Sequence, residues 1–205
     1  SLGFLDRFLA CCEAYNIPVL ILFNKIDLLN FEEVELVEEL QAMYENLGYQ
    51  TLQVSSAEKL NLDKLQEILK DKTCVFFGHS GAGKSTLANA LQPDLNLKTN
   101  EISETHNKGK HTTTFAQMHF WHFGGAVIDT PGVREFAMID VEKEEIQHYF
   151  PEKIEKGREC KFHNCKHINE PKCAVLEALE TGEILESRYI TYLKLMEEAE
   201  EQNQM

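Results

Sequence analysis

Short, continuously apolar runs alternate along the chain with longer segments in which apolar residues recur at helical spacing. The run IPVLILFNKID has no polar alternation, which is typical of a strand buried on both faces of a parallel sheet. By the same criteria, strands are expected over 17–27, 49–57 and 73–80, and helices over 4–12, 31–48 and 62–72. This alternation predicts an α/β fold with right-handed crossovers and helices on both faces of the sheet.

The second half of the chain continues this pattern, and its composition changes near residue 150. A helix is expected over 85–93, and two strands joined by a Gly-Gly turn are expected over 116–132. The polar segment 94–115 lacks periodicity and is expected to be a long mobile loop. From about residue 150 a Lys- and Cys-containing stretch leads into a Glu-rich helix, whose 177–201 part we expect to face solvent. We therefore predict two domains, 1–150 and 151–205.

Composition and charge narrow the class of protein. The chain has 205 residues with 34 acidic and 20 basic side chains, a net charge of -14 that argues against a globally basic nucleic-acid coat. No apolar run approaches the roughly 20 residues that span a bilayer, and the first residues resemble no cleavable leader. We expect a cytoplasmic monomer without a membrane partner. The first residue is Ser rather than Met, so a piece of a longer protein is expected.

A phosphate-binding loop follows the strand expected over 73–80. The sequence GHSGAGKST fits G-x-x-x-x-G-K-[ST] between a strand and a helix, the context in which backbone N–H groups surround phosphate oxygens. Lys84 is expected to reach the outer phosphates, and Ser85 to bind Mg²⁺. The alternative, an ordinary Gly-rich turn, does not account for the complete pattern. The expected nucleotide-binding residues of this loop are Gly78, His79, Ser80, Gly81, Ala82, Gly83, Lys84, Ser85 and Thr86.

Two further segments supply candidate ligands for Mg²⁺ and the γ-phosphate. DTPG follows a strand, so Asp129 is expected to hold Mg²⁺ and the backbone N–H of Gly132 to contact the γ-phosphate. The long loop ends in HTTT, where Thr113 is the favoured third Mg²⁺ ligand, with Thr112 and Thr114 as close alternatives. A β-branched strand start is the competing interpretation of the Thr run.

The segment NKID predicts a guanine site at the end of the first strand. Asp27 can accept hydrogen bonds from the ring N–H and the exocyclic amine of guanine, whereas adenine would leave the carboxylate unpaired. Lys25 can lie along the ring plane, and Asn24 can tie the base loop to the phosphate loop. In SSA (Ser55, Ser56 and Ala57) the Ala57 backbone N–H is expected to meet the guanine carbonyl. Alone, NKID is also compatible with a turn, but the phosphate loop makes this alternative weak.

The order of these motifs departs from that of most nucleotide-binding domains, because the base loop precedes the phosphate loop. A parallel sheet fixes which strand ends converge, whatever the order of the chain, and adjacent termini can be joined while the chain is cut elsewhere. The sequence therefore predicts a P-loop GTPase sheet in circularly permuted order.

Hydrolysis requires a group that orients water. Val133 follows DTPG and cannot serve. His111, beside the Thr run, is the candidate, because imidazole can hydrogen-bond water or stabilise charge. A solvated loop histidine is the alternative interpretation.

The C-terminal stretch predicts a metal site. Cys160, Cys165, His167 and Cys173 form C-x₄-C-x-H-x₅-C, a ligand set for one closed, structural Zn²⁺ site, with unligated cysteines as the alternative and His163 as a decoy. Such a metal would fold a small, mostly helical subdomain that lacks a core of its own. Basic residues around it suggest either a face for RNA phosphates or solvated surface; they are Lys153, Lys156, Arg158, Lys161, Lys166 and Lys172.

Together, NKID, SSA, GHSGAGKST, HTTT and DTPG, followed by the metal spacing, resemble the RsgA family of small-ribosomal-subunit-dependent GTPases. The resemblance covers nearly the whole chain. It implies a Mg²⁺-dependent GTP hydrolase that acts late in small-subunit maturation, binds the subunit and its rRNA, is stimulated by the subunit, and uses His111 in hydrolysis. It also implies an N-terminal OB-fold, to which nothing in this chain corresponds. The alternatives are a nucleotide-gated RNA- or ribosome-binding module with negligible hydrolysis and an ATP-using kinase or transporter subunit, which Asp27 argues against.

Overall fold

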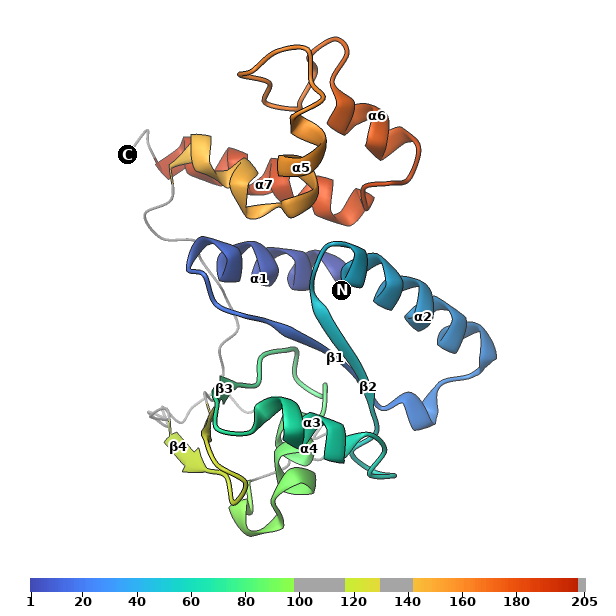
Figure 1. The fold of residues 1–205 in the computed structure, drawn as a ribbon, viewed down its shortest axis with the longest axis vertical. Coiled ribbons are helices and arrows are strands. Elements are labelled where there is room, and N and C mark those ends of the chain that lie inside the picture. Colours follow the sequence, from blue (N-terminus) through green and yellow to red (C-terminus); the bar gives the residue numbers. More distant parts are fainter. Residues whose placement is uncertain (98–116, 130–141, 203–205) are drawn as a thin grey trace, which may run out of the picture. The chain divides into compact units, whose positions relative to one another are not determined.

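The computed structural model describes residues 1–97, 117–129 and 142–202, without the side chains of Asp129 and Gln202 (Figure 1). Most of the predicted loop over 94–115 lies outside these residues. The chain divides into two compact units, which are Leu20–Arg134 and the combination of Ser1–Val19 with Glu135–Met205. This grouping assigns the first helix to the C-terminal residues, so the predicted division at residue 150 stays a prediction.

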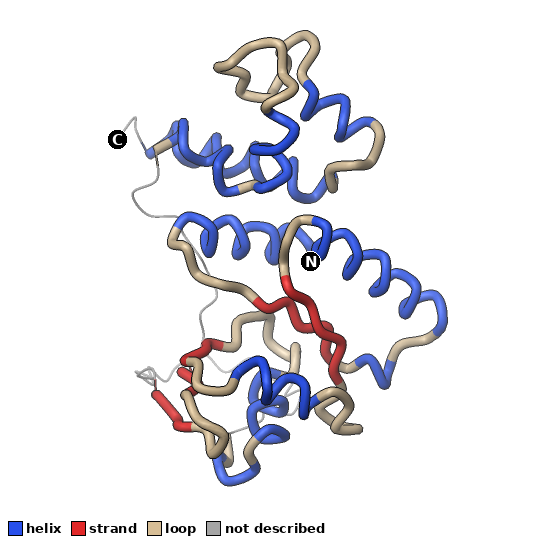
Figure 2. The backbone as a smooth tube through the Cα atoms, viewed as in Figure 1, coloured by secondary structure: helices blue, strands red, loops and turns tan. Residues whose placement is uncertain are grey.

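The first unit, Leu20–Arg134, contains all the strands of the described residues (Figure 2). Strands β1 (Leu20–Asn24) and β2 (Gln50–Val54) pair in parallel, with Leu20 opposite Gln50 and Asn24 opposite Val54. In a second sheet, β5 (Ala126–Asp129) lies between β3 (Thr73–Val75), which is parallel to it, and the antiparallel β4 (Gln117–Phe120). The strands are shorter than predicted, and β3 ends five residues before the predicted end at residue 80. The backbone beyond β3 belongs to the phosphate loop instead.

Helices connect these strands. In chain order they are the 3₁₀ turn η1 (Ile26–Leu28), α2 (Phe31–Asn46), α3 (Leu62–Leu69), α4 (Lys84–Leu91) and the 3₁₀ turn η2 (Pro93–Leu95). The start of α2 is fixed by a capping box, in which the Asn30 side chain accepts from Glu33 N while Glu33 accepts from Asn30 N. The amphipathic helix α3 buries Leu62, Leu65 and Leu69, which lie on one face.

One apolar cluster holds this unit together. It draws on β2, α3, α4, the turn before β5 and β5 itself; its buried members are Val54, Leu62, Leu65, Leu69, Leu87, Ala88, Leu91, Trp121 and Val127. The Gln92 side chain, nearly inaccessible to solvent, accepts from His122 N (2.8 Å) and donates to Phe120 O (3.3 Å), which fastens the end of α4 to the β4–β5 turn. This packing holds α4 in place, and α4 begins directly after the phosphate loop.

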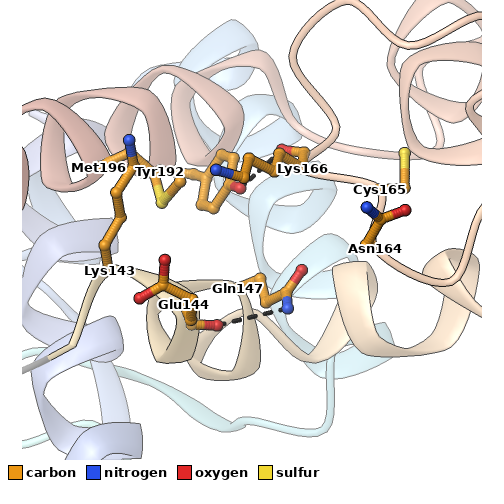
Figure 3. A pocket seen from close by; sticks show the side chains of 8 residues that line it. All are labelled: Lys143, Glu144, Gln147, Asn164, Cys165, Lys166, Tyr192 and Met196. Atoms are coloured by element: carbon orange, nitrogen blue, oxygen red, sulfur yellow. Dashed lines mark hydrogen bonds between the residues drawn. The ribbon is translucent and has the colours of Figure 1, made fainter.

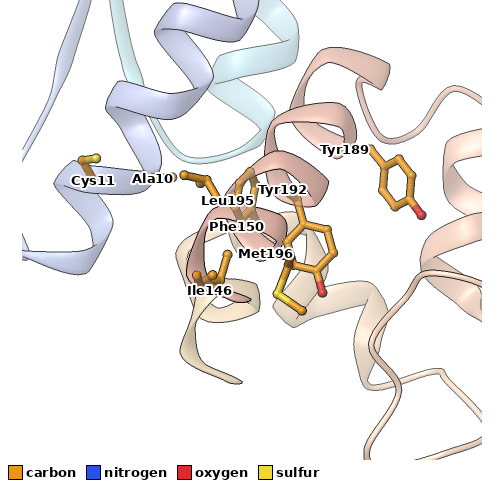
Figure 4. Packing of buried hydrophobic residues seen from close by; sticks show 9 residues of the cluster. Ala10, Cys11, Ile146, Phe150, Tyr189, Tyr192, Leu195 and Met196 are labelled. Carbon is orange, nitrogen blue, oxygen red and sulfur yellow. The ribbon is translucent and has the colours of Figure 1, made fainter. Parts of the chain in front are cut away.

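The second unit is helical in the described residues. Its elements are α1 (Leu2–Ala14), the 3₁₀ helix η3 (Lys143–Tyr149), α5 (Pro151–Gly157), α6 (Ala174–Glu180) and α7 (Glu186–Gln202). Their core combines aromatic, aliphatic and sulfur side chains from α1, η3 and α7 (Figure 4); it contains Ala10, Cys11, Ile146, Phe150, Tyr189, Tyr192, Leu195, Met196 and Ala199. The phenylalanine and tyrosine rings of Phe150 and Tyr192 meet edge to face, 5.7 Å between centroids.

The prediction that residues 177–201 form one solvated helix is wrong. The helix α6 ends at Glu180 and α7 begins at Glu186. Although α7 is rich in Glu, Tyr189, Tyr192, Leu195 and Met196 recur at helical spacing and are buried. The exposed face of α7 carries most of its glutamates together with Ile190 and Lys194. Among the helices that the structure describes, none has the length and apolar character needed to cross a bilayer.

Candidate functional site

The phosphate loop adopts backbone angles that its glycines permit. Gly81 and Gly83 have φ values of 81° and 90°, in the left-handed region. Gly83 is the N-cap of α4, so the loop leads directly into the first turn of the helix, where Ser85 is half-buried. The Lys84 ammonium donates to the carbonyl oxygens of Gly78 (2.6 Å) and His79 (2.9 Å). The loop therefore places a lysine and a helix N-terminus at one concave turn of backbone, an arrangement suited to phosphate.

The base loop lies against this phosphate loop. Asn24, the last residue of β1, donates its side-chain amide to Ala82 O (3.1 Å), and Lys25 Nζ donates to Gly81 O (2.7 Å). Lys25 itself has a left-handed backbone (φ 68°) that turns its side chain back from the strand end. The tie that we predicted for Asn24 is therefore present in the structure.

Gly83 also leaves room for Asn24, because it has no side chain where the base loop packs against the phosphate loop. A Cβ atom at Gly83 would lie 2.5 Å from Asn24 Nδ2, well inside van der Waals contact. By contrast, a Cβ at Gly81 would meet nothing within 4 Å. Of these two glycines, only Gly83 thus combines a left-handed backbone with a contact that excludes any side chain.

Two serines complete the base side of the site. Asn24 Oδ1 accepts from Ser56 Oγ (3.0 Å) and Ser56 N (3.3 Å), and Ser55 Oγ accepts from Glu58 N (3.0 Å). Both serines are buried, while Ala57 is exposed in the turn that follows. Asp27 is exposed in η1, two residues beyond Lys25. The structure therefore gathers the base loop, the serine turn and the phosphate loop around one region of unit Leu20–Arg134.

The remaining predicted nucleotide residues are placed only in part. His79, Ser80 and Thr86 are exposed on the phosphate loop and the first turn of α4. Asp129 is the last residue of β5, where its backbone pairs with Gln117, but its side chain is not described. His111, Thr112, Thr113, Thr114, Gly132 and Val133 lie outside the described residues. Their roles stay predictions.

The four predicted metal ligands converge in the second unit. The ligand atoms of Cys160, Cys165, His167 and Cys173 all lie within 4.8 Å of one another. His167 Nδ1 is 3.6 Å from Cys160 Sγ and 3.4 Å from Cys173 Sγ, and these two sulfurs are 3.9 Å apart. A tetrahedral Zn²⁺ shell, from its bond lengths of about 2.3 Å to sulfur and about 2.05 Å to nitrogen, requires separations of about 3.8 Å and about 3.5 Å. The cluster therefore fits a tetrahedral metal ion, and His163 is exposed and outside it.

Burial sets the protonation of these ligands. It raises the pKa of Cys165 to about 12 and also raises the pKa of Cys173. The pKa of His167 is lowered by burial and by the charge of Lys153. The metal-free cluster thus presents a neutral imidazole and thiols that a metal must deprotonate.

Three residues that the sequence pattern did not single out hold the metal loop in place. Tyr189 OH donates to His167 O (2.8 Å), and Tyr192 OH donates to Lys166 O (2.7 Å). The Glu170 carboxylate accepts from the backbone N–H groups of Lys166, Ile168 and Asn169 at 2.7–3.1 Å. Burial acts to raise the pKa of Glu170, but these donors outweigh it and bring the pKa to about 2. The helical spacing of the two tyrosines within the Glu-rich segment is the sequence feature that could have revealed them.

The basic residues around the cluster differ in position. Arg158, Lys161, Lys166 and Lys172 are exposed, and Lys156 pairs with Glu183 at 2.5 Å. Lys153 is 1% exposed, so the prediction that it belongs to a basic surface is wrong. Burial lowers its pKa to about 7, while Glu152, Cys173 and Cys165 act in the opposite direction. The helix α5 directs this side chain into the unit rather than out of it.

A small cavity lies beside the metal loop (Figure 3). Its volume is about 150 Å³, and its walls come from η3, the loop that carries Cys165, and α7. Met196 and Tyr192 supply apolar wall, while Lys143 pairs with Glu200. Gln147 donates to Glu144 O across one side (3.3 Å). The cavity leaves one side of the Cys165 region less tightly packed.

Comparison with known proteins adds an independent finding. The family model described as RsgA GTPase matches residues 1–139. Two proteins named small ribosomal subunit biogenesis GTPase RsgA are similar to the chain: that of Christiangramia forsetii is 48% identical over 97% of the chain, and that of Flavobacterium psychrophilum is 50% identical over 95%. The chain spans only 63% and 60% of their respective lengths.

Two solved structures resemble the chain as a whole. The crystal structure of YjeQ from Thermotoga maritima matches 97% of the chain with a TM-score of 0.80 and 39% identity, and the chain covers 66% of it. The structure of YloQ, described as a circularly permuted GTPase, matches 98% of the chain with a TM-score of 0.75 and 36% identity, and the chain covers 64% of it.

Proposed function

The chain belongs to the RsgA GTPase family, and from this premise we propose that it binds GTP with Mg²⁺ and hydrolyses it to GDP and phosphate. We further propose that it acts in the late maturation of the small ribosomal subunit, as a cytoplasmic monomer that contacts the subunit and its rRNA. Because the chain spans less than two thirds of its named relatives, the docking of the whole protein can involve residues that this chain does not contain.

The observation that carries the proposal is the pair of ties between the base loop and the phosphate loop. Asn24 holds Ala82 and Lys25 holds Gly81, so a guanine contact at one loop is mechanically connected to the phosphate contacts at the other. Asn24 and Ala82 are 58 positions apart in the sequence. A hydrogen bond between the base loop and the phosphate loop is expected where both loops bind the same nucleotide. Asp27, in the next turn of chain, then selects guanine through its ring N–H and exocyclic amine.

Each residue of the proposed site has one task. Lys84 balances the charge of the outer phosphates, and the glycine-rich backbone donates to their oxygens. Ser85, Thr113 and Asp129 would hold Mg²⁺, which neutralises developing charge when bound. Gly132 N–H senses the γ-phosphate, and the Ala57 N–H meets the guanine carbonyl. His111 orients the attacking water, since Val133 has no polar atom to do so.

The second unit contributes a structural metal site in this proposal. One Zn²⁺ bound by Cys160, Cys165, His167 and Cys173 has no open position for a substrate, so its effect is to hold the loop between α5 and α6. The exposed lysines near it give the acidic chain a local cationic surface, which suits contact with phosphates of rRNA.

The test is GTP turnover by this chain with and without purified small ribosomal subunits, with ATP as the control nucleotide. We expect slow basal hydrolysis, a marked rise with subunits, and no turnover of ATP. His111→Ala should abolish the stimulated rate while GDP affinity is kept. Asp27→Asn should weaken GTP and favour xanthosine triphosphate, because an amide can donate where the carboxylate could only accept.

The opposing outcomes are distinct. Tight GTP binding with no turnover under any condition would favour the nucleotide-gated binding module, which the valine at position 133 makes the second candidate. ATP that competes as well as GTP would overturn the guanine site itself. Turnover that subunits do not change would overturn the ribosomal coupling of this chain and leave GTP hydrolysis standing.

A further inference from the structure

Lys153 has an environment that is unusual for a lysine. Its side chain is 1% exposed, and its ammonium lies 3.8 Å from the ring centre of Tyr192 and 4.5 Å from that of Tyr189. Among the described residues the ammonium has no hydrogen-bond partner. Two aromatic faces attract a cation, but they do not replace the hydrogen bonds that water gave it. Burial therefore favours loss of the proton from such an ammonium unless an opposite charge lies nearby.

The adjacent carboxylate does not supply that charge alone. Glu152 is bound by Arg188, whose Nε and Nη2 donate to its two oxygens at 2.6 Å and 3.0 Å. The Glu152 charge is therefore largely engaged in a bidentate pair, although Arg188 also lies 3.6 Å from the buried carboxylate of Asp6. Cys173 and Cys165 act electrostatically on Lys153 in the same direction as Glu152 when they carry charge as thiolates, the form in which they would bind a metal.

A metal at this cluster would carry a net charge. Three thiolates and a neutral imidazole around Zn²⁺ sum to -1, by the charges of the ligands in the Cys₃His shell. Cys165, His167 and Cys173 are buried, so solvent screens this charge poorly. The anionic complex and the ammonium of Lys153 belong to the same unit, and Tyr189 and Tyr192 contact both the ammonium and the metal loop.

We propose that Lys153 is the counter-cation of the metal–thiolate centre, a positioning residue that neutralises the complex without binding the metal. The inference rests on the proposed Zn²⁺ site. Tyr189 and Tyr192 contact both Lys153 and the metal loop. The Lys153 ammonium lies over the faces of their rings. Their hydroxyls donate hydrogen bonds to the carbonyl oxygens of His167 and Lys166. Two residues of α7 therefore contact both the ammonium and the backbone of the metal loop.

The test compares zinc affinity in three variants of this 205-residue chain, measured by competition with a chromophoric chelator. Lys153→Met removes the charge and keeps the length of the side chain, and we expect it to weaken zinc binding by about 10- to 100-fold. Lys153→Arg keeps the charge, and its zinc affinity should be closer to that of the wild type than the affinity of Lys153→Met. The matched control is Lys156→Met on the same helix, where the ammonium is more exposed and paired with Glu183; its zinc affinity should not change.

A second measurement separates this role from simple packing. Metal-free Lys153→Met should resist denaturant at least as well as the metal-free wild type, because an uncompensated buried charge has been removed. Weaker zinc binding together with equal or greater metal-free stability is the expected signature. Cobalt(II) in place of zinc should still give thiolate charge-transfer absorption in the variant, at higher metal concentration.

Two results would overturn the assignment of Lys153. One is zinc affinity that Lys153→Met leaves unchanged; the other is a loss of affinity that merely tracks a loss of metal-free stability. If the wild-type chain bound no zinc, or its cobalt form showed no thiolate absorption, the metal site itself would fail, and the assignment with it. Wild-type binding therefore distinguishes the failure of one proposal from the failure of the other.

Discussion

The side-chain amide of Asn24 donates a hydrogen bond of 3.1 Å to the backbone oxygen of Ala82, 58 positions later in the chain. The oxygen of the same side chain accepts from Ser56 Oγ at 3.0 Å and from Lys25 N at 2.9 Å. One amide therefore connects the end of β1, the serine turn after β2, and the phosphate loop. These segments come from three separate parts of the sequence, and Asn24 fixes their relative position together with the hydrogen bond from Lys25 Nζ to Gly81 O.

Replacing Asn24 with Ala should weaken nucleotide binding more than it weakens the fold. The substitution removes these three hydrogen bonds and the fourth from Ser56 N, each contributing about 1 kcal/mol net to the arrangement of the loops, so we expect GDP affinity to fall by about 10- to 100-fold. Fluorescent-GDP titration measures this. Asn89→Ala is the control, since Asn89 makes two hydrogen bonds with the Leu97 backbone in the same unit. Equal losses of GDP affinity in the two variants would contradict a specific role for Asn24.

Gly83→Ala and Gly81→Ala should differ although both glycines have left-handed backbones. Both variants strain the backbone, by about 1 kcal/mol, but only the new methyl at position 83 meets Asn24 Nδ2. We expect Gly83→Ala to lower GDP affinity at least about 10-fold more than Gly81→Ala. In an Asn24→Ala background that difference should largely vanish, because the clashing atom is gone. A difference that persists in the double mutant would locate the cause elsewhere in the loop.

Much of the fold can be predicted from local sequence patterns. The order of NKID, phosphate loop and DTPG predicts a circularly permuted α/β GTPase, which the likeness to two solved structures confirms. Glycine-rich loops and buried strands are recognised from short stretches of sequence, so a circular permutation of the chain does not change their patterns. The strand ends are harder to predict, because the apolar residues Phe76 and Phe77 continue past β3 without continuing its hydrogen bonds.

The surroundings of the metal loop are less accessible from sequence. The spacing of Cys160, Cys165, His167 and Cys173 suffices to predict that they converge, since four soft ligands in a short stretch are typical of a metal site. Charge alone, however, does not reveal burial, and the sequence pattern therefore places Lys153 at the surface. Its burial depends on Tyr189 and Tyr192, which lie far later in the sequence, and such long-range packing has no local pattern.

Zinc binding should release protons at about pH 7. Burial raises the pKa of Cys165 to about 12 and raises that of Cys173, so both are protonated in the metal-free chain, while His167 is neutral because its pKa is lowered. A metal must displace at least these two protons, so zinc affinity should fall as pH is lowered from about 8 to about 6. Calorimetry in two buffers of different ionisation enthalpy counts the protons. A binding enthalpy independent of the buffer would show that the thiols are not the ligands.

The last prediction concerns Arg188, which is fully buried and binds the Glu152 carboxylate at 2.6 Å and 3.0 Å. Its Nη1 also lies 3.6 Å from the buried carboxylate of Asp6 on α1. Arg188→Met would leave these carboxylates without their cation, and removing one partner of a buried pair costs about 3–5 kcal/mol of unfolding free energy. Denaturant unfolding of the metal-loaded chain measures the loss.

Arg7→Met provides the comparison on α1. Arg7 also forms a bidentate pair, with Glu198, but the two side chains are 28% and 43% exposed. A solvent-exposed pair contributes about 0.2–1 kcal/mol, so this variant should be nearly as stable as the wild type. Adding Glu152→Gln to Arg188→Met removes one of the stranded charges and should recover part of the loss. If Arg188→Met cost no more than Arg7→Met, the buried cluster would not be what holds α1, α5 and α7 together.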